Sequence, residues 1–544
     1  MTDLFATYAH DMAGSGAYDE MFTGAQDVRP AFNRVSDVLG SLDLGDVTSR
    51  DESMARSFLD RGVTFDFAGE ERPFPLDIVP RVLTVEEWEV LERGVKQRVK
   101  ALEIFLDDVY GDQKVITDGI VPRSLITSSA HFHRQVWGFK PAGGVRIHVA
   151  GIDVVRDDDG VFRVLEDNVR VPSGVSYVIE NRRAMMKGLP EAFMSTPIMA
   201  VDSYPRHLLH ALKATAPEPG EDAVVVVLTP GVFNSAYFEH TLLAGLMGVE
   251  LVEGRDLVVR GDRVYMRTTE GEQRVDVIYK RIDDDFTDPL QFLPESVLGC
   301  PGLVNAARAG NVTIANAVGN GVADDKLVYS YVPELIRYYL AEEPILPNVD
   351  TYRLEEEEAR EYVLAHLDEL VVKPVDGSGG KGIVIGPRAT AQELAELREK
   401  VLADPRGWIA QPVLQLSTVP TFDGEGFSPR HVDLRPFCVN SGEDMYVLPG
   451  GLTRVAMTKG SLIVNSSQGG GSKDTWVIGK RTAPVEPPPE REETVASMAA
   501  VPVATHWADD TDLTDQQQQQ QQMRQSPAPP HSVAPARHVD SQEA

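Results

Sequence analysis

Residues 370–382, with the sequence LVVKPVDGSGGKG, hold the pattern on which the interpretation of the whole chain depends. An apolar run ends at Lys373-Pro374, and four glycines lie among the six residues from Gly377 to Gly382. Glycine permits close backbone approach and positive φ, so such a loop can present several N–H donors to an anion. Ser378 and Lys381 would add a hydroxyl group and a positive charge. The stretch is therefore either a strand with a phosphate-binding loop or an ordinary hairpin turn.

The spacing of these glycines excludes two common phosphate-binding motifs. A P-loop places Gly-Lys-Ser or Gly-Lys-Thr four residues after its first glycine, and this stretch has no such sequence. The dinucleotide motif Gly-x-Gly-x-x-Gly opens a helix, whereas residues 377–382 do not. Elsewhere, residues 222–281 read as a small α/β unit, but their Thr229-Pro230-Gly231 turn lacks the glycine spacing that binds pyrophosphate. A nicotinamide oxidoreductase built on that unit stays open as an alternative.

The composition is that of an ordinary folded protein with a strong acidic excess. The 544 residues are 42% hydrophobic and 25% charged, and the formal net charge is −31. Nucleic-acid binding needs a basic surface, so this charge argues against a nucleic-acid partner. Any phosphate-binding site must then be a small basic region within an acidic surface. The two cysteines, Cys300 and Cys438, form no spacing motif, which favours a reducing compartment over a disulfide framework.

No targeting or membrane segment is predicted. Residues 1–14 contain neither a basic n-region nor an apolar h-region. The longest apolar run, residues 223–228, is far too short to span a bilayer. We therefore expect a cytoplasmic protein without a membrane partner, and we find no pattern that indicates its oligomeric state.

Two patterns in the first third of the chain have clear structural meanings. Residues 84–109 predict a long amphipathic helix, and Thr84 with Glu87 forms a capping box at its start. Residues 145–166 then predict two strands joined by a hairpin over residues 157–160, DDDG.

Three oxygen-bearing side chains lie on those two strands. Glu166 and Asn168 are two residues apart, so in an extended chain they project to the same side, and Asp153 would lie across the hairpin. Carboxylate and amide oxygens suit Mg²⁺ that bridges phosphates. The alternative is that Glu-Asp-Asn only punctuates a loop before a Pro-Ser-Gly turn.

The remaining segments alternate between helices and strands. The 222–281 unit is predicted to contain a buried strand AVVVVL, a helix over residues 235–247 and further strands ending in VDVIYKR. A helix begins near Asp325-Lys326, and MYVLPGGLTRVAM predicts a hairpin over residues 449–451. The sequence after about Arg481 is rich in Pro and Gln, so it is predicted to be a disordered tail.

Together these pieces resemble an ATP-grasp ligase whose chain has been cut and rejoined. The motifs of that family occur here in the usual order, except that the two that normally close it, AGIDVVR at 150–156 and LEDNVRVPSG at 165–174, stand first. The others are Asp325-Lys326, Lys373 with Gly377–Gly382, Gln411, Asp433-Leu434-Arg435, Arg454, and Asn465 with Gly469–Gly471. This order is similar to that of the circularly permuted ATP-grasp proteins, relatives of glutathionylspermidine synthetase. The segments PRVLTVEEWEVLERGVKQRVKALEIFLDDVYG and TPGVFNSAYFEH resemble their type 2 group. Circular permutation costs little when the original termini lie close together at a surface.

The resemblance implies a role for each candidate residue. ATP phosphates would be held by two lysines and covered by the glycine-rich loop, and the adenine pocket would include a glutamine and a valine. The residues implied to bind ATP are Lys326, Lys373, Gly377, Ser378, Gly379, Gly380, Lys381, Gly382, Gln411 and Val413. Mg²⁺ would be bound by Asp153, Glu166 and Asn168. Arg435 and Arg454 would be catalytic, stabilising charge on the transferred phosphoryl group or binding an acidic substrate.

Several of these residues also have plainer interpretations. Arg435 could pair structurally with Asp433, and Arg146 and Arg281 are weaker candidates for the substrate side. His431 with Asp433, two residues apart, would be the start of a transition-metal site. His131 and His133 have the same spacing but no further ligands in the sequence.

The expected architecture is a mixed α/β fold: a circularly permuted ATP-grasp with an inserted Rossmann-like pre-ATP-grasp unit and a disordered C-terminal tail. Its expected parts are an N-terminal helical region (1–120), a segment with the Mg²⁺ strands (121–200), the pre-ATP-grasp-like unit (222–315), a segment with the nucleotide lysines and glycine-rich loop (320–480) and the tail (481–544). The resemblance implies an ATP- and Mg²⁺-dependent carboxylate–amine ligase, of peptide type, acting through an acyl phosphate. Its partners would be a small-molecule or peptide carboxylate and an amine. The alternative is a catalytically silent ATP-binding protein that works within a larger complex.

Overall fold

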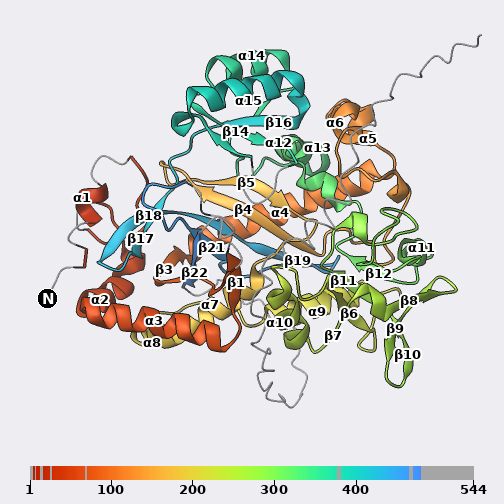
Figure 1. Cartoon of the computed structure of the whole chain (residues 1–544), viewed down its shortest axis with the longest axis horizontal. Helices are drawn as coiled ribbons and strands as arrows, with labels where there is room; N and C mark the ends of the chain where they lie inside the picture. The colour runs from red at the N-terminus through yellow and green to blue at the C-terminus, as the bar shows by residue number, and fades with distance from the viewer. Residues whose placement is uncertain are drawn as a thin grey trace, which may run out of the picture.

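The computed structural model describes most of the chain up to residue 479 (Figure 1). The described residues are 4–5, 8–12, 16–24, 27–67, 70–376, 382–462, 464 and 470–479. Residues 377–381 of the predicted phosphate loop, Asn465 and the predicted tail from residue 481 lie outside them.

The centre of the molecule is a nine-stranded sheet assembled from distant parts of the chain. Its main path runs β20–β19–β4–β18–β21–β22–β3, with β5 paired to β4 and β17 paired to β18. The strands are β3 (Leu76–Thr84), β4 (Val149–Arg156), β5 (Phe162–Asn168), β17 (Thr418–Phe422), β18 (Phe427–Arg435), β19 (Phe437–Asn440), β20 (Met445–Val447), β21 (Leu452–Val455) and β22 (Gly471–Ile478). The β4–β5 hairpin therefore lies beside strands that follow it by more than 250 residues in the sequence.

Helices cover both faces of this sheet because its strands alternate their apolar side chains between two buried clusters. Leu83 and Val477 pack in one cluster with α4 (Val85–Val109), whereas their neighbours Val82 and Trp476 belong to another. The helices α1 (Tyr8–Met12), α2 (Asn33–Ser41), α3 (Leu44–Asp60), α7 (Val175–Gly188) and α8 (Pro190–Ser195) lie in the N-terminal and middle parts of the chain. The predicted capping box of α4 is confirmed, because Thr84 accepts from the Glu87 N–H and Glu87 accepts from the Thr84 N–H.

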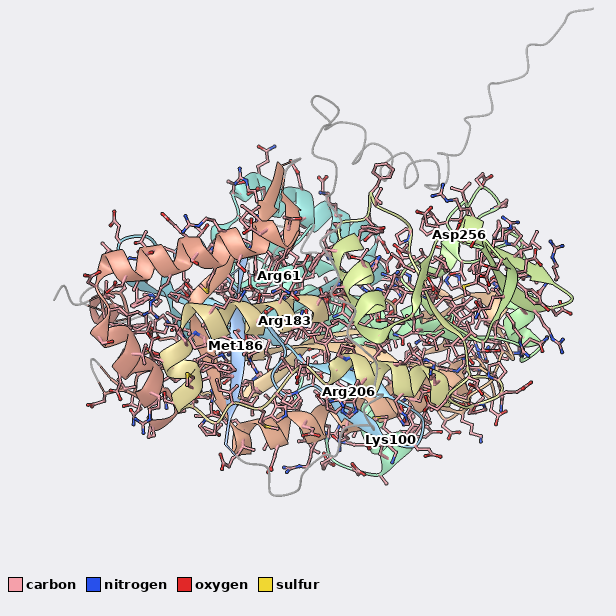
Figure 2. All side chains as sticks on the ribbon, turned by 90° about the horizontal axis from the view of Figure 1, so that it is seen from below. Arg61, Lys100, Arg183, Met186, Arg206 and Asp256 are labelled. Atoms are coloured by element: carbon pink, nitrogen blue, oxygen red, sulfur yellow. The ribbon has the colours of Figure 1, made fainter. Side chains whose placement is uncertain are left out.

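A buried carboxylate joins α3 to α7. Glu180 is 2.7 Å from Arg61 and 2.6 Å from Arg183, and its side chain is 1% exposed. Figure 2 shows Arg61 and Arg183 near each other on the underside of the molecule. A buried carboxylate is stable only when paired. Since Arg183 lies on α7 itself, the ion pair between Glu180 and Arg61, the residue that follows α3, is the one that links the two helices.

The predicted α/β unit forms a separate parallel sheet, seen at the lower right of Figure 1. Its strand order is β12–β11–β6–β7, and all three pairings are parallel. Its elements are β6 (Val225–Leu228), β7 (Glu250–Val252), β11 (Val277–Lys280), β12 (Thr313–Ala315), α9 (Tyr204–Ala214), α10 (Tyr237–Met247) and α11 (Leu303–Arg308). A three-stranded antiparallel extension contains β8 (Leu257–Arg260), β9 (Arg263–Thr268) and β10 (Gly271–Val275). Its last strand, the polar GEQRV, was not predicted.

The Lys373 stretch belongs to a small four-stranded sheet, drawn at the top of Figure 1 beneath two helices. The order is β13–β16–β14–β15. Its strands are β13 (Tyr352–Arg353), β14 (Leu370–Pro374), β15 (Val384–Ile385) and β16 (Trp408–Pro412), and its helices are α14 (Glu357–Ala365) and α15 (Ala391–Ala403). A two-stranded sheet pairs β1 (Thr64–Phe67) with β2 (Glu70–Pro73). The short helices are α5 (Lys114–Thr117), α6 (Arg123–Thr127), α12 (Lys326–Ser330) and α13 (Val332–Leu340), and α12 and α13 lie between the small sheet and the central one.

The hairpin predicted over residues 449–451 is wrong. β20 pairs with β19, while β21 pairs with β18 and β22, so β19, β4 and β18 separate the two strands. Of the two glycines in this turn, Gly450 and Gly451, the second is required for a steric reason. A Cβ on Gly451 would lie 2.5 Å from the Arg435 carbonyl oxygen. The turn is glycine-rich because its backbone passes directly over the end of β18.

The overall class matches the expected mixed α/β fold. Among the described residues, no helix combines the length and the apolar composition that a membrane crossing requires.

Candidate functional site

The three side chains expected to bind metal lie together on one face of the β4–β5 hairpin. Asp153 is directly opposite Glu166, and Gly151 is opposite Asn168. Since directly paired residues share a face of the sheet, the two carboxylates and the amide project to the same side. Asp153 is buried, and Glu166 and Asn168 are partly exposed.

Two arginines from neighbouring strands reach the same place and bind Asp153. Arg435 Nε lies 2.5 Å from Asp153 Oδ1 and Arg435 Nη2 lies 2.8 Å from Oδ2, while Arg454 Nη2 is 2.7 Å from Oδ2. Burial alone would raise the pKa of Asp153, but the two guanidinium groups lower it to about 2. The carboxylate is therefore ionised at any physiological pH.

Arg454 has a second carboxylate partner, Asp433, which on sequence alone could instead have paired with Arg435. Arg454 Nε lies 2.9 Å and 3.0 Å from the two oxygens of Asp433, its partner across the β18–β21 pairing. Burial raises the pKa of Asp433, and Arg454 opposes that rise. The result is a buried chain of alternating charges: Arg435, Asp153, Arg454, Asp433.

The two predicted nucleotide lysines approach this network from the other side. Lys326, the first residue of α12, has its Nζ 3.8 Å from Glu166 Oε2 and 3.5 Å from the carbonyl oxygen of Val375. Asp325 fixes the start of that helix, since it caps the Leu327 N–H at 2.9 Å and binds Arg406 at 2.6 Å. Lys326 thus connects the metal strands with the segment that precedes the predicted phosphate loop.

Lys373 and Gln411, both expected to bind nucleotide, are in direct contact. Lys373 Nζ donates to Gln411 Oε1 at 2.6 Å, and Gln411 Nε2 donates to Thr351 Oγ1 at 2.9 Å. Burial lowers the pKa of Lys373 to about 8, although Glu166 opposes the effect. Within the described part of the chain, no carboxylate lies within ion-pair distance of Lys373, so the site holds a cation that a phosphate group would stabilise.

The remaining predicted nucleotide residues are less informative. Val413 follows β16 and is half-buried. Gly382 is described, with φ of 76°, and a Cβ there would lie 3.2 Å from Pro374 Cγ. The other five loop residues, Gly377, Ser378, Gly379, Gly380 and Lys381, lie outside the described residues.

The donor set fits Mg²⁺ better than a transition metal. Two carboxylates and an amide oxygen are hard ligands, and Mg²⁺ completes its octahedron with water and phosphate oxygens. The Asn168 amide nitrogen, Nδ2, is buried without a hydrogen-bond partner in the described structure. This donor suits a phosphate or water oxygen, whereas the amide oxygen is the atom that would bind the metal. The described residues contain no group of three His, Cys, Asp or Glu side chains arranged for metal binding.

The histidine alternatives do not assemble into sites. His431 Nδ1 lies 2.8 Å from the carbonyl oxygen of Leu416, and its proposed co-ligand Asp433 is bound to Arg454. His131 contacts Arg170 at 3.4 Å, whereas His133 lies 3.9 Å from Asp285.

Sequence reasoning missed the residues that hold the segment after Asn168. Arg281, which was a candidate for the substrate side, is buried: it lies 3.1 Å from Glu239 and donates to Pro172 O at 2.8 Å and Ser173 Oγ at 2.6 Å. Glu239 accepts from the N–H of Gly174 at 2.7 Å. Arg435 in turn donates to Ser173 O at 3.2 Å, so this segment connects the parallel unit with the arginines.

The other substrate-side candidate, Arg146, is also buried and donates to the carbonyl oxygen of Phe139 at 2.6 Å. No local pattern marks Glu239 as functional, because its partner Arg281 is distant in the sequence. Asp433 belongs to a predicted motif, but the sequence did not indicate its partner Arg454.

Comparisons with known proteins show the family and a similar fold. A family model described as circularly permuted ATP-grasp type 2 matches residues 80–456. An uncharacterized protein of Mycobacterium leprae (strain TN) is 60% identical over 475 residues, which are 87% of this chain and 85% of that protein. A Frankia alni protein with the provisional name glutamate–cysteine ligase 2-3 is 48% identical over 85% of this chain, but the match covers only 54% of that protein. The solved structure of a glutathione synthetase-like effector from Globodera pallida has a similar fold, with a TM-score of 0.52 over 81% of this chain and 99% of that one, at 11% identity.

Proposed function

The chain belongs to the circularly permuted ATP-grasp type 2 family, and from that premise we propose that it is an ATP- and Mg²⁺-dependent ligase that joins a carboxylate to an amine. The observation that supports this proposal most directly is the 3.8 Å approach of Lys326 to Glu166. Lys326 belongs to the proposed nucleotide site and Glu166 to the proposed metal site. The two residues are far apart in the sequence, and this contact brings the two sites together. Phosphoryl transfer needs this combination of cations and metal ligands, and little covalent chemistry from the protein.

In the proposed reaction, this chain's residues bind and orient the reactants. Lys326 and Lys373 hold the phosphates, and Arg435 and Arg454 stabilise charge on the phosphoryl group as the substrate carboxylate attacks it. Asp153, Glu166 and Asn168 would hold Mg²⁺, which neutralises phosphate charge when bound. The attack forms an acyl phosphate and ADP, and an amine then displaces phosphate from the acyl carbon. We place this reaction in the cytoplasm.

The retained residues favour the enzyme over the catalytically silent alternative. A protein that only bound ATP for assembly would have no need for arginines that stabilise charge on a transferred phosphoryl group, the role we propose for Arg435 and Arg454. Here both arginines are held in position by buried carboxylates. We therefore propose turnover rather than nucleotide binding alone.

The Frankia relative suggests where to begin the substrate search. Its name gives glutamate and cysteine as the acid and the amine, but the matched part is about half of that protein. The named activity could reside in the other half, so we propose the substrate class of an amino acid or short peptide carboxylate with an amino-acid amine. Glutamate and cysteine are the first pair to test.

Calorimetric titration with a non-hydrolysable ATP analogue, with and without Mg²⁺, tests the nucleotide site. We expect Mg²⁺-dependent binding to the wild type that is lost in both Lys373→Ala and Glu166→Gln, which lie on opposite sides of the site. Mg²⁺-dependent binding that is unchanged in Glu166→Gln would contradict the assignment of the metal site to β4 and β5. ADP release across a panel of carboxylates and amines then tests turnover, and its absence throughout, with nucleotide binding intact, would instead support the silent alternative.

A further inference from the structure

Asp153 is expected to bind Mg²⁺, yet both of its oxygens are already engaged by cations. Three guanidinium nitrogens lie within 2.8 Å of its carboxylate, and its side chain is 3% exposed. Arg435 makes a bidentate contact, which is the strongest arrangement between these two groups. A divalent cation would have to approach the same oxygens next to two fixed positive charges, so metal binding by Asp153 in this state is opposed.

The two arginines are not equally dependent on Asp153. Arg454 retains Asp433, with which it makes contacts at 2.5 Å, 2.9 Å and 3.0 Å. Without Asp153, the one hydrogen-bond acceptor that Arg435 keeps in the described structure is the Ser173 carbonyl oxygen at 3.2 Å. Arg435 is therefore the group that most needs a new anion if Asp153 turns away.

A transferring phosphate can supply that anion. We propose that Asp153 exchanges partners: arginines bind it in the ligand-free chain, and the nucleotide's phosphate takes over those arginines and releases it to the metal. Asp433 is the positioning residue that keeps Arg454 in place during the exchange. Metal and nucleotide binding are then positively coupled at this site. The inference rests on the proposed function, because it takes the nucleotide and Mg²⁺ as the ligands.

The exchange makes a prediction that simple metal ligation does not. In the absence of metal, wild-type arginines must leave Asp153 before they can bind phosphate, and this cost lowers the nucleotide affinity. In Asp153→Asn that competition is removed. The matched control is Asp158→Asn, which removes one negative charge from the exposed turn of the same β4–β5 hairpin, outside the residues assigned to metal or nucleotide.

The experiment measures binding of AMP-PNP to the full chain by calorimetry in buffer containing EDTA, then in buffer containing Mg²⁺. Since a charged hydrogen bond contributes about 1.5–3 kcal/mol, we expect Asp153→Asn to bind AMP-PNP about tenfold or more tightly than wild type without metal. Asp158→Asn should change this affinity about threefold at most. Added Mg²⁺ should strengthen binding to the wild type and do little for Asp153→Asn.

A wild-type measurement keeps the proposal falsifiable if Asp153→Asn does not fold. Mn²⁺ binding, followed by electron paramagnetic resonance, should be about tenfold or more weaker without AMP-PNP than with it, after correction for Mn²⁺ bound by free nucleotide. Equal metal-free affinities of the two variants, or equal Mn²⁺ binding with and without AMP-PNP, would overturn the exchange while leaving the ligase proposal intact. Failure of the wild type to bind AMP-PNP under either condition would overturn the proposed function as well.

Discussion

Replacement of Lys373 by methionine should stabilise the fold at neutral pH while it destroys the nucleotide site. Burial lowers the pKa of this lysine from 10.5 to about 8, so the folded chain holds a charge that it disfavours. Methionine is similar in length and carries no charge. A side chain kept at a cost to stability is the signature of a functional group, because the cost is recovered only when an anion binds.

The size of the change in unfolding free energy follows from the lowered pKa of Lys373. One pKa unit corresponds to about 1.4 kcal/mol, so the charged lysine costs about 3 kcal/mol near pH 7, where it is protonated in both the folded and the unfolded chain. The cost decreases as the pH rises through 8 and disappears above 10.5, where the lysine is neutral in both states. Methionine also leaves Gln411 Oε1 without its 2.6 Å donor, which subtracts about 1–3 kcal/mol at every pH. The net gain at neutral pH is therefore about 0–2 kcal/mol.

Urea unfolding of wild type and Lys373→Met at about pH 7 and about pH 9.5 checks the reasoning. The difference in unfolding free energy should move in favour of the wild type by about 2 kcal/mol between the two pH values, because only the wild type loses the charge cost. The lost hydrogen bond does not titrate, so it drops out of this comparison. A difference that stays constant with pH, or one that moves in favour of the variant, would show that Lys373 is not a disfavoured charge.

Three further substitutions separate structural from functional effects. Thr84→Ala removes one half of the α4 capping box and should cost about 1 kcal/mol of unfolding free energy in urea titrations, with nucleotide affinity unchanged. Arg98→Met leaves Asp167 buried without its bidentate partner, and denaturation should show a loss of about 3–5 kcal/mol. Gly151→Ala places a Cβ 3.1 Å from the Arg435 Cδ; calorimetry should show nucleotide binding weakened severalfold while the circular dichroism spectrum is retained.

Much of the local structure could be predicted because its signals are short-range. The Thr84–Glu87 box, the DDDG turn and the alternation of β4 and β5 each depend on residues within a few positions of one another. The same holds for the face shared by Glu166 and Asn168, which follows from strand geometry alone. The family resemblance then supplied the order of the motifs, and with it the identity of the residues that meet at the site.

The partners of those residues could not be predicted, because they depend on which strands become neighbours. Asp433 and Arg435 alternate on one strand, and nothing in that spacing shows that Asp433 binds Arg454 or that Arg435 binds Asp153. The hairpin predicted at Gly450-Gly451 was wrong for the same reason. A hairpin and a close passage over another strand both require glycine, and only the tertiary structure distinguishes them.

The net charge of the chain influences whether free ATP or its Mg²⁺ complex binds. The segment from residue 481 holds ten acids and four arginines, which leaves a net charge of −25 for residues 1–480. At the site, the four cations Arg435, Arg454, Lys326 and Lys373 stand against the three anions Asp153, Asp433 and Glu166, a balance of +1. Free ATP carries about four negative charges, so the acidic body repels it strongly, and Mg²⁺ halves that charge.

Salt should consequently speed the association of the Mg²⁺–nucleotide complex with this protein. Screening over about 10 Å at 0.1 M ionic strength weakens the repulsion from the distant acidic surface more than the short contacts within the site. Stopped-flow measurements with a fluorescent ATP analogue at increasing ionic strength, with Mg²⁺ present, should therefore show a rising association rate constant. A rate constant that falls with salt would mean that the local cations dominate the field, and that the acidic body plays no part in selecting the metal complex over free ATP.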